Sequence, residues 1–350
     1  MKIHEKYILR SIELGKNGLG TTAPNPMVGC VIAYQDIIIG EGFTSPFGGP
    51  HAEVNAIRSV KNKQLLKEST LYVTLEPCAH HGKTPPCVDL IISAQIPKVV
   101  IGVKDPHDKV AGKGIAKLVA AGCEVITAVL ESNCREHHRR FLTFHEKKRP
   151  YIILKWAQTL DGFIAPERTS RTQEPHPVWI TNIYSRQKVH QWRSEEQAIL
   201  VGTNTVLMDN PKLTTRSWAG RSPLRFVLDK NLKTPDTYHI FDKTADTVIF
   251  TQKDLQKTAQ PGVQYEGIDF SRDIARQISE VLFNRDIQSL LVEGGAMTLR
   301  SFIKANLWDE ARIFIGNQSF HKGLKAPVIT GKGINELRVG SDSLKILRND

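Results

Sequence analysis

The spacing of four residues between positions 51 and 87 constrains this chain most. One residue separates His51 from Glu53, Cys78 follows a proline, and eight residues intervene between Cys78 and Cys87. One imidazole and two thiolates form a three-ligand zinc site whose fourth position stays open, as in catalytic zinc centres. A glutamate beside such a site that does not bind the metal can move protons. The spacing therefore predicts zinc-dependent hydrolytic deamination of an amino-substituted heterocycle, with Glu53 as the catalytic residue.

Each predicted zinc ligand lies where a helix begins or a strand ends. His51 and Glu53 open a segment typical of a helix start, and Pro85 and Pro86 place Cys87 at another. The partial positive charge of a helix N-terminus favours a thiolate over a thiol. The apolar run over residues 70–75 is typical of a strand and would deliver Cys78 at its end. For each residue alone, core packing or a chance match is the alternative.

Charge and cysteine usage limit the possible partners and location. The net charge is +11, and it is spread over both halves, with local basic clusters only at residues 137–140 and 146–149 and no interleaved aromatic residues. Such a field suits small phosphorylated molecules, so we expect no nucleic-acid partner. No apolar run approaches membrane-spanning length and no signal peptide is apparent, so we expect a cytoplasmic protein without disulfides. Cys30 and Cys123 are expected in the core.

Strand and helix signals alternate along the chain, which predicts an α/β protein. At 350 residues two domains are expected, and a seam near residues 147–150 divides the chain into 1–147 and 148–350. The helices expected in the first half cover residues 4–18, a segment from 51, a segment after 87, and 113–121. Its strands are expected at 28–33, 37–41, 70–75, 98–103 and 124–129. In the second half we expect strands at 151–154, 198–201, 225–228, 247–250 and 289–292, and helices near 182–192 and 272–283.

A Gly-Gly turn at Gly294 and Gly295 separates a buried strand from a predicted helix. Glycines there let backbone N–H groups approach a phosphate at the helix N-terminus, although a plain tight turn is the alternative. The glycine-containing segments 111–114 and 331–333 do not match nucleotide-binding motifs and are predicted to be loops. Beyond Gly331 we expect only a terminal hairpin.

Longer strings of residues resemble the RibD family of riboflavin biosynthesis. In the first half they are 24–31, 51–53 and 74–87, and in the second half 155–162, 179–181, 201–214 and 292–295. The resemblance runs from about residue 4 to about residue 330. It implies a bifunctional enzyme, in which a zinc-dependent diaminohydroxyphosphoribosylaminopyrimidine deaminase precedes an NADPH-dependent reductase that converts ribosyl to ribityl. It also implies a cytidine-deaminase-like α/β/α sandwich followed by a dihydrofolate-reductase-like α/β domain, and we expect a homo-oligomer.

The resemblance carries roles to matching positions of this chain. In the deaminase it implies that His51, Cys78 and Cys87 bind zinc and that Glu53 donates the proton. The implied substrate-binding residues are Asn25, His80, Lys83, Arg193, Leu213, Arg216 and Glu293. The implied cofactor-binding residues are Ala157, Trp179, Thr205, Asp209, Gly295, Ala296, Met297, Thr298, Leu299, Arg300 and Ser301.

Two arginines and one lysine in the second half have chemistry that suits this substrate. Arg193 and Arg216 are expected to clamp a phosphate, since guanidinium groups bind phosphate bidentately. Lys155 is a candidate for polarising the opened sugar. The alternative for all three is an ordinary solvated charge. Two positions depart from the family pattern: Pro177 replaces a substrate-binding serine, and Lys230 replaces a cofactor-binding serine. Lys230 is still expected to bind the cofactor at its adenosine phosphate, and the alternative is that this contact is lost.

Two other functions compete with a bifunctional enzyme. A stand-alone nucleobase or tRNA deaminase with an unrelated tail would also carry the zinc motif. A non-catalytic zinc-stabilised binding protein with a degenerate reductase-like half would need a fourth ligand, and His80 or His81 is the available candidate.

Overall fold

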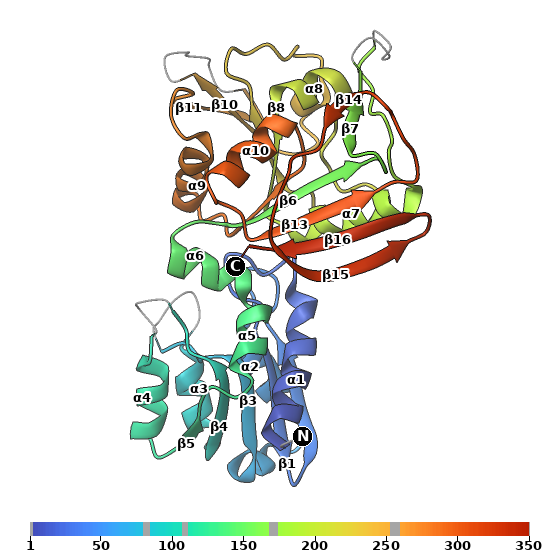
Figure 1. Cartoon of the computed structure of the whole chain (residues 1–350). Helices are drawn as coiled ribbons and strands as arrows, with labels where there is room; N and C mark the ends of the chain where they lie inside the picture. The colour runs from blue at the N-terminus through green and yellow to red at the C-terminus, as the bar shows by residue number, and fades with distance from the viewer. Residues whose placement is uncertain (1–2, 80–84, 107–110, 168–173, 253–259, 350) are drawn as a thin grey trace. The chain divides into compact units, whose positions relative to one another are not determined.

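The structure is a computed structural model, which describes residues 3–79, 85–106, 111–167, 174–252 and 260–349. It divides into two compact units, Met1–Lys148 and Arg149–Asp350. Figure 1 shows the elements of both units in chain order. None of the helices in these ranges is both long and apolar enough to cross a membrane.

Unit 1 is built on a five-stranded mixed sheet with the order β2-β1-β3-β4-β5. The strands are β1 (Gly29–Tyr34), β2 (Ile37–Phe43), β3 (Thr70–Leu75), β4 (Lys98–Val103) and β5 (Glu124–Ile126). β1 runs antiparallel to both β2 and β3, whereas β3, β4 and β5 are parallel. The carboxyl end of β3 therefore lies inside the sheet, where the chain leaves it toward Cys78.

Helices cover both faces of this sheet, which makes unit 1 an α/β/α sandwich. They are α1 (Ile3–Gly15), α2 (Ala52–Ser59), α3 (Cys87–Ser93), α4 (Lys113–Ala120), α5 (Glu131–His137) and α6 (Arg139–Lys147). A Cβ on Gly29 would lie 1.8 Å from a backbone oxygen of α1, and one on Gly42 would lie 2.4 Å from a backbone nitrogen of α2. Cys30 pairs with Gly42 in the sheet, so Gly29 and Gly42 face opposite ways and the two helices pack on opposite faces.

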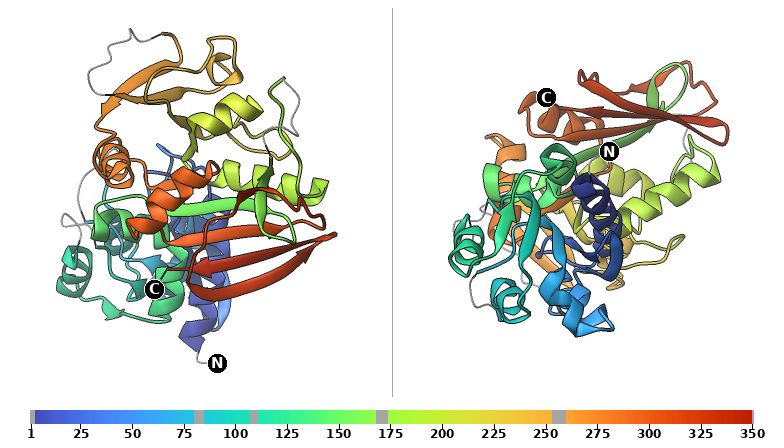
Figure 2. Two further views of the ribbon diagram at one scale, coloured as in Figure 1. Left: turned by 45° about the horizontal axis from the view of Figure 1, so that its top comes forward. Right: turned by 90° about the horizontal axis from the view of Figure 1, so that it is seen from below.

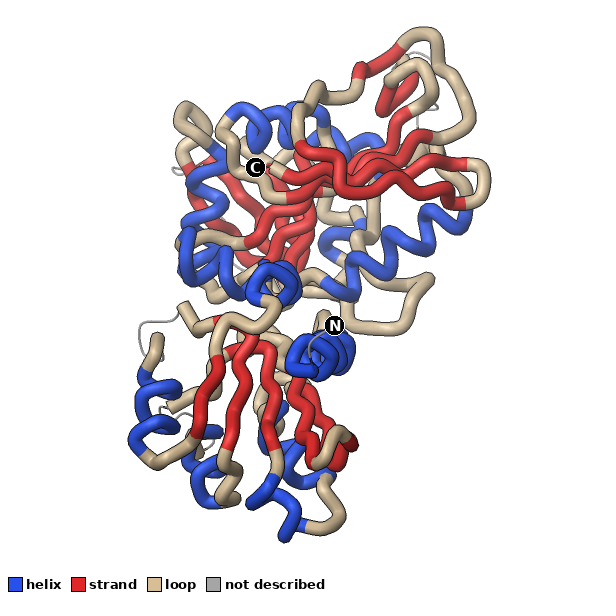
Figure 3. Tube along the Cα trace, turned by 60° about the horizontal axis from the view of Figure 1, so that its bottom comes forward, coloured by secondary structure: helices blue, strands red, loops and turns tan. Residues whose placement is uncertain are grey.

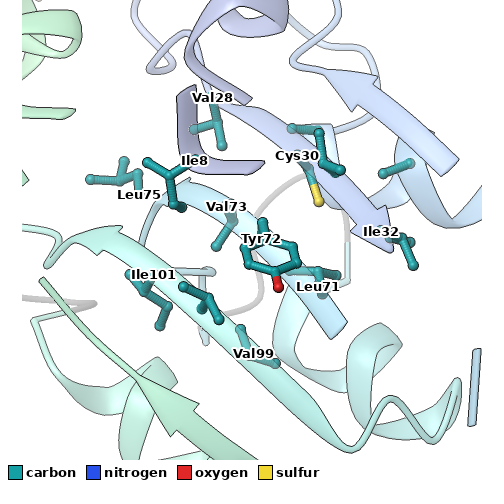
Figure 4. Packing of buried hydrophobic residues seen from close by; sticks show 14 of the residues in the cluster. Ile8, Val28, Cys30, Ile32, Leu71, Tyr72, Val73, Leu75, Val99 and Ile101 are labelled. Carbon is teal, nitrogen blue, oxygen red and sulfur yellow. The ribbon is translucent and has the colours of Figure 1, made fainter. Parts of the chain in front are cut away.

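The core of unit 1 comes from the apolar side chains of these strands. Val73, Val99 and Ile101 are fully buried, and Ile8 of α1 is buried in the same cluster (Figure 4). Burying a side chain of this size contributes about 1.5–3 kcal/mol. Figure 3 shows the strands side by side between their helices. Cys30 is buried among them as predicted, while Cys123 is only partly buried at the rim.

Unit 2 contains a nine-stranded sheet with the order β11-β10-β9-β8-β12-β6-β13-β16-β15. Its strands are β6 (Tyr151–Gln158), β8 (Ala198–Gly202), β9 (Leu224–Leu228), β10 (Thr247–Gln252), β11 (Val263–Ile268), β12 (Ser289–Val292), β13 (Glu310–Ile315), β15 (Lys332–Val339) and β16 (Asp342–Arg348). The strands from β11 to β13 in this order are parallel, and the β15–β16 hairpin adds to β13 in the antiparallel sense. A separate small ribbon pairs β7 (Phe163–Pro166) with β14 (Gly323–Lys325).

Alternate residues of β6 show how the helices cover both faces of this sheet. Ile152 and Leu154 belong to the core under α9 (Ile274–Asn284) and α10 (Ala296–Lys304). Tyr151 and Ile153 pack with Trp192 of α7 (Ile183–Glu195) on the other face. Figure 2 shows α9 and α10 against the sheet and the red terminal hairpin at its edge. Within the described residues, the remaining helices are α8 (Thr203–Asp209) and the 3₁₀ turns at Lys16–Gly18, Lys63–Glu68 and His239–Phe241.

Several predicted elements agree with the structure, and others are corrected. The strands predicted at 70–75, 98–103 and 289–292 are confirmed to the residue, and the terminal hairpin is confirmed. The strand predicted at 124–129 ends at Ile126. The segment 331–333, predicted as a loop, contributes Lys332 and Gly333 to β15, and neither of these two residues has an apolar side chain that would indicate a strand. No element was predicted from the sequence at α5, α6, α8, β7, β11, β13 or β14.

Candidate active sites

The structure brings His51, Cys78 and Cys87 together in unit 1. His51 is the N-cap residue of α2, Cys87 is the first residue of α3, and Cys78 follows β3. His51 Nδ1 lies 3.2 Å from Cys87 Sγ and 3.7 Å from Cys78 Sγ, and the three ligand atoms all lie within 4.8 Å of one another. This is the cluster that the spacing of these residues predicted.

The donor set and its spacing fit a zinc ion. Zinc–sulfur bonds of about 2.3 Å and zinc–nitrogen bonds of about 2.0 Å in a tetrahedron separate the ligand atoms by roughly 3.5–3.8 Å, close to the distances observed. The Cys87 thiol and the His51 imidazole lower the pKa of Cys78 well below its ordinary value, and the Cys87 N–H also points at its sulfur at 3.4 Å. The cluster is therefore able to present a thiolate to a metal at neutral pH.

Glu53 lies beside this cluster on the first turn of α2 and is only 4% exposed. Burial, with a further contribution from Cys78, raises the pKa of its carboxyl group to about 7. A carboxyl group with a pKa near neutrality can both accept and release a proton. The geometry therefore suits the proton-carrying role predicted for Glu53.

The predicted substrate positions of unit 1 are described only in part. Asn25 is partly buried in the loop before β1, and its N–H donates to the Thr22 carbonyl at 2.9 Å. His80 and Lys83 lie outside the described residues. His81 also lies outside the described residues, so the alternative in which His80 or His81 is a fourth zinc ligand falls outside them as well.

Glu76 is a buried residue of this site that sequence reasoning missed. Its carboxylate accepts N–H groups from Asp105 at 3.3 Å, Gly112 at 3.0 Å, Gly114 at 3.0 Å and Ile115 at 3.2 Å. The N-terminus of α4 is thus occupied by a carboxylate of the protein itself. The prediction of a loop over 111–114 is corrected, because Gly112 is the N-cap of α4 and the next two residues are helical.

In unit 2, a lysine, an arginine and a glutamate form a buried ion cluster. Arg193 Nε and Nη2 donate to the two carboxylate oxygens of Glu293, both at 2.8 Å, and Lys155 Nζ lies 3.8 Å from Glu293 Oε2. Their side chains are 11%, 5% and 14% exposed in the order Arg193, Glu293 and Lys155. The alternative of ordinary solvated charges is therefore wrong for Lys155 and Arg193.

Burial and mutual attraction act on the pKa values in this cluster. Burial lowers the pKa of Lys155, and Glu293 opposes this shift. Burial also works against ionisation of Glu293, but Arg193 and Lys155 outweigh it and lower the pKa of that carboxyl group. His190 has its pKa lowered to about 4 by burial and by Arg193, and its neutral Nδ1 accepts the Arg216 N–H at 3.3 Å.

Arg216 and Leu213 lie on the segment that follows α8. Arg216 is exposed, and its pKa is lowered by partial burial and by the charge of Arg193, which places the two guanidinium groups in one electrostatic environment. The Leu213 side chain is buried and its backbone has a φ of 58°. Arg193, Arg216 and Glu293 therefore gather in one region, as a shared substrate site requires.

Glycines at the ends of β8 and β12 form a cradle. A Cβ on Gly202 would lie 2.5 Å from Thr298 Oγ1, one on Gly294 would lie 3.0 Å from Thr205 Oγ1, and one on Gly295 would lie 3.2 Å from Thr298 Oγ1. Gly295 is the N-cap of α10, with a φ of 79° and no side-chain cap. Bare backbone, two hydroxyl groups and a helix N-terminus at the carboxyl ends of parallel strands fit the diphosphate of a dinucleotide such as NADPH.

Comparisons with known proteins agree with both sites. Residues 1–103 match the cytidine and deoxycytidylate deaminase zinc-binding region, and residues 150–344 match the RibD C-terminal domain. The RibD protein of Aquifex aeolicus is 39% identical over 99% of this chain and 94% of its own length. The crystal structure of a diaminohydroxyphosphoribosylaminopyrimidine deaminase/5-amino-6-(5-phosphoribosylamino)uracil reductase from Thermotoga maritima is 39% identical, covers 99% of each chain and has a TM-score of 0.89. The chain belongs to the RibD family.

Membership of the RibD family settles the class of protein. The chain carries both the zinc-dependent deaminase domain and the NADPH-dependent reductase domain of this bifunctional riboflavin-biosynthesis enzyme. A RibD structure from Acinetobacter baumannii, 31% identical with a TM-score of 0.88, also covers 99% of this chain. The rival of a deaminase with an unrelated tail is therefore wrong.

The other predicted cofactor positions lie on several elements of unit 2. Ala157 lies on β6, Asp209 ends α8, and Lys230 is exposed one residue after the buried Asp229, with its Nζ 5.9 Å from the Phe270 ring centre. On α10, Met297 is 78% exposed, whereas Leu299 is fully buried in the core. Ala296 is buried, the Ser301 hydroxyl donates to the Thr298 carbonyl, and Arg300 Nη2 donates to the Lys325 carbonyl.

Trp179 contacts Arg186, a residue that was not predicted from the sequence to belong to the site. The indole is 50% exposed, and the guanidinium carbon of Arg186 lies 4.4 Å from its ring centre. Arg186 lies one turn before His190 and two turns before Arg193 on α7, so all three share one face of the helix. Pro177, the position of the missing serine, is partly buried two residues before Trp179.

Proposed function

We propose that unit 1 deaminates diaminohydroxyphosphoribosylaminopyrimidine and that unit 2 reduces 5-amino-6-(5-phosphoribosylamino)uracil with NADPH. The observation that supports the deaminase activity most strongly is the His51–Cys78–Cys87 cluster beside the buried carboxyl group of Glu53. The family membership of the whole chain adds the second activity. The phosphate on both compounds agrees with the positive net charge of the chain.

In the deaminase, Glu53 carries the proton that the reaction must move. Zinc held by His51, Cys78 and Cys87 would supply an acidified water as the nucleophile. The Glu53 carboxylate takes a proton from the attacking water and delivers it to the pyrimidine ring nitrogen. It then moves a second proton, from the hydroxyl group that the water has placed on the ring carbon, to the amino group, which departs as ammonia when its bond to that carbon breaks. Burial of Glu53 excludes bulk water from this exchange. Asn25 is proposed to orient the pyrimidine from the loop before β1.

In the reductase, the buried ion cluster handles the opened sugar and its phosphate. NADPH at the glycine cradle would supply the hydride. Lys155 carries a desolvated ammonium group. This group donates a hydrogen bond to the oxygen or nitrogen atom bonded to the sugar carbon that accepts the hydride, and so polarises that carbon. Glu293 keeps Lys155 charged and orients Arg193. Arg193 and Arg216 are proposed to hold the phosphate, because a guanidinium group can bind a phosphate through two parallel hydrogen bonds.

Three further properties are proposals that the structure supports indirectly. In the basic cluster at residues 137–140, His137 and His138 are buried, and in the cluster at 146–149, Arg149 pairs with Asp309 at 2.6 Å. These side chains are therefore not available to a nucleic acid, which argues against a nucleic-acid partner. Exposed apolar side chains at Val328, Ile334 and Leu337 support a homo-oligomer. Five free cysteines support a cytoplasmic location.

The variant Glu53→Gln tests the proposal directly. It preserves the size of the side chain and removes the proton carrier, so ammonia release from the diaminopyrimidine should fall by about 10²–10⁴-fold. NADPH oxidation with the deaminated substrate should keep its wild-type rate in the same preparation. Near-normal ammonia release by the variant would contradict the role of Glu53.

A further inference from the structure

Two adjacent histidines outside both proposed active sites are buried in unit 1. His137 ends α5 and His138 follows it, and they are 5% and 1% exposed. Their rings meet edge to face, with centres 4.6 Å apart. The sequence places them in a basic cluster, but burial lowers the pKa of His137 to about 4 and that of His138 well below its ordinary value. At neutral pH the pair is therefore neutral and does not form a cationic surface.

His137 contacts the backbone that follows Asn25. Its Nε2 lies 2.7 Å from the Met27 carbonyl oxygen, and because a carbonyl only accepts, Nε2 carries the hydrogen and donates it. Gly15 of α1 closes the contact from the other side. A Cβ there would lie 2.5 Å from His137 Nε2 and 2.7 Å from the Met27 oxygen. Gly15 therefore packs directly against this hydrogen bond, and a side chain at position 15 would displace one of its partners.

His138 reaches the same stretch of backbone through Thr74. Its Nε2 lies 2.9 Å from Thr74 Oγ1, and that hydroxyl oxygen accepts the Gly29 N–H at 3.2 Å. A Cβ on Gly29 would lie 1.8 Å from the Ser11 carbonyl of α1. The consecutive side chains of His137 and His138 therefore hold both ends of the segment 27–29.

We propose that His137 is a positioning residue of the deaminase, which sets the place of Asn25 by holding the Met27 carbonyl. Asn25 is two residues from Met27, and its own N–H donates to the Thr22 carbonyl at 2.9 Å, so the short backbone around Asn25 is held between these two contacts. Misplacing a group that orients a substrate by about 1 Å can cost about 10²-fold in rate. This inference rests on the proposed function, in which Asn25 orients the pyrimidine.

The position of α5 makes this role additional to the zinc motif. The deaminase zinc-binding region matches residues 1–103, and α5 begins at Glu131. Cys134 of α5 packs on Gly102 of β4, where a Cβ would lie 2.2 Å from its sulfur, so α5 is anchored directly to the sheet. The segment after the matched region thus supplies a side chain that supports the substrate loop.

Two amide variants of His137 test the proposal against a purely structural role. Gln places an amide N–H near the position of Nε2, whereas Asn, one methylene shorter, falls short of Met27. We expect His137→Asn to raise the KM of deamination for the diaminopyrimidine about tenfold, and His137→Gln to keep it within about twofold of the wild type. The zinc content of both variants and their NADPH oxidation with the deaminated substrate should equal those of the wild type.

The controls separate this inference from the proposed function. Asn25→Ala should raise the same KM, and if it does not, the role of Asn25 fails before His137 is considered. If Asn25→Ala raises the KM and His137→Asn leaves it unchanged, the positioning role is overturned. It is equally overturned if the Gln and Asn variants raise the KM to the same extent. If the Asn variant is poorly folded, a wild-type KM for His137→Gln together with a raised KM for Gly15→Ala supports the proposal, and a wild-type KM for Gly15→Ala overturns it.

Discussion

Arg193 and Glu293, one hundred residues apart in the chain, face each other through two parallel hydrogen bonds of 2.8 Å. This pair joins α7 to the turn after β12, and Lys155 of β6 adds a second positive charge 3.8 Å away. One carboxylate therefore serves two cations, and Arg216 adds a third nearby. The surplus positive charge suits the phosphate of the substrate, and the pair fixes the arginine that is proposed to bind it.

Replacing Glu293 by Gln should destabilise unit 2 and impair the reductase. Removing one partner of a buried ion pair typically costs about 3–5 kcal/mol, because the other charge stays buried without compensation. We expect a loss in this range in urea unfolding, together with a fall of more than tenfold in reductase kcat/KM. The matched control is Glu266→Gln, which breaks the more exposed pair with Arg285 at 2.7 Å and should cost about 0–1 kcal/mol. Equal losses for the two variants would contradict this account.

The same pair should make the stability of unit 2 depend on pH in acid. The folded protein lowers the pKa of Glu293, chiefly because Arg193 and Lys155 outweigh the effect of burial. Its stabilising contribution is therefore fully present above the ordinary pKa of 4.5 and is lost as the pH falls through the lowered value. Urea unfolding below pH 4.5 should show a shallower loss of stability for Glu293→Gln than for the wild type. If the stabilities of the wild type and the variant fell in parallel below this pH, Glu293 would have the same pKa in the folded and unfolded states, which contradicts this account.

The strands whose ends were predicted most accurately are those with a clear run of apolar residues in the sequence. β3, β4 and β12 are short apolar runs buried on both faces, so their ends follow from where the run stops. The zinc cluster was also predictable, since few roles other than metal binding combine one histidine and two cysteines at this spacing.

Other features depend on contacts between distant segments and leave no local signal. His137, at the end of α5, and His138, which follows it, are buried and contact Met27 and Thr74, which are more than sixty residues away in the chain. The position of Arg193 beside Glu293 likewise follows from the order of strands in the sheet. Helix α5 therefore resembles an exposed polar segment in the sequence, and the pairing of the reductase charges required the structure.

Replacing Glu76 by Ala should weaken zinc binding as well as stability. The change leaves four backbone N–H groups without their acceptor, and each buried unsatisfied donor costs about 1–3 kcal/mol. Because Glu76 lies two residues before Cys78, the backbone that carries this ligand should loosen. We expect a zinc affinity at least tenfold lower by competition with a chelator. The control Glu68→Ala, at an exposed position, should leave zinc affinity unchanged. An unchanged affinity for Glu76→Ala would limit this residue to a purely local role at α4.

Replacing Lys230 by Ala should weaken NADPH binding while leaving NADH nearly unchanged. The two cofactors differ by one phosphate, and an ammonium group beside it contributes about 1–2 kcal/mol, or roughly a tenfold preference. The salt dependence of NADPH affinity should also flatten, because added ions screen an exposed charge pair. Titration of cofactor fluorescence at two salt concentrations measures both effects. Equal changes for the two cofactors would show that the phosphate is held elsewhere.

The most direct test of the two-site account uses one cuvette and both substrates. The full chain is mixed with NADPH and the diaminopyrimidine ribotide, and NADPH absorbance is followed with zinc bound and again after the zinc has been removed by a chelator. We predict that NADPH is oxidised only while zinc is bound, since the reductase acts on the deaminated product. Adding that product to the chelated protein should restore oxidation at the original rate. Continued oxidation of NADPH with the diaminopyrimidine after chelation, or none with the deaminated product, would contradict the assignment of two successive reactions to this chain.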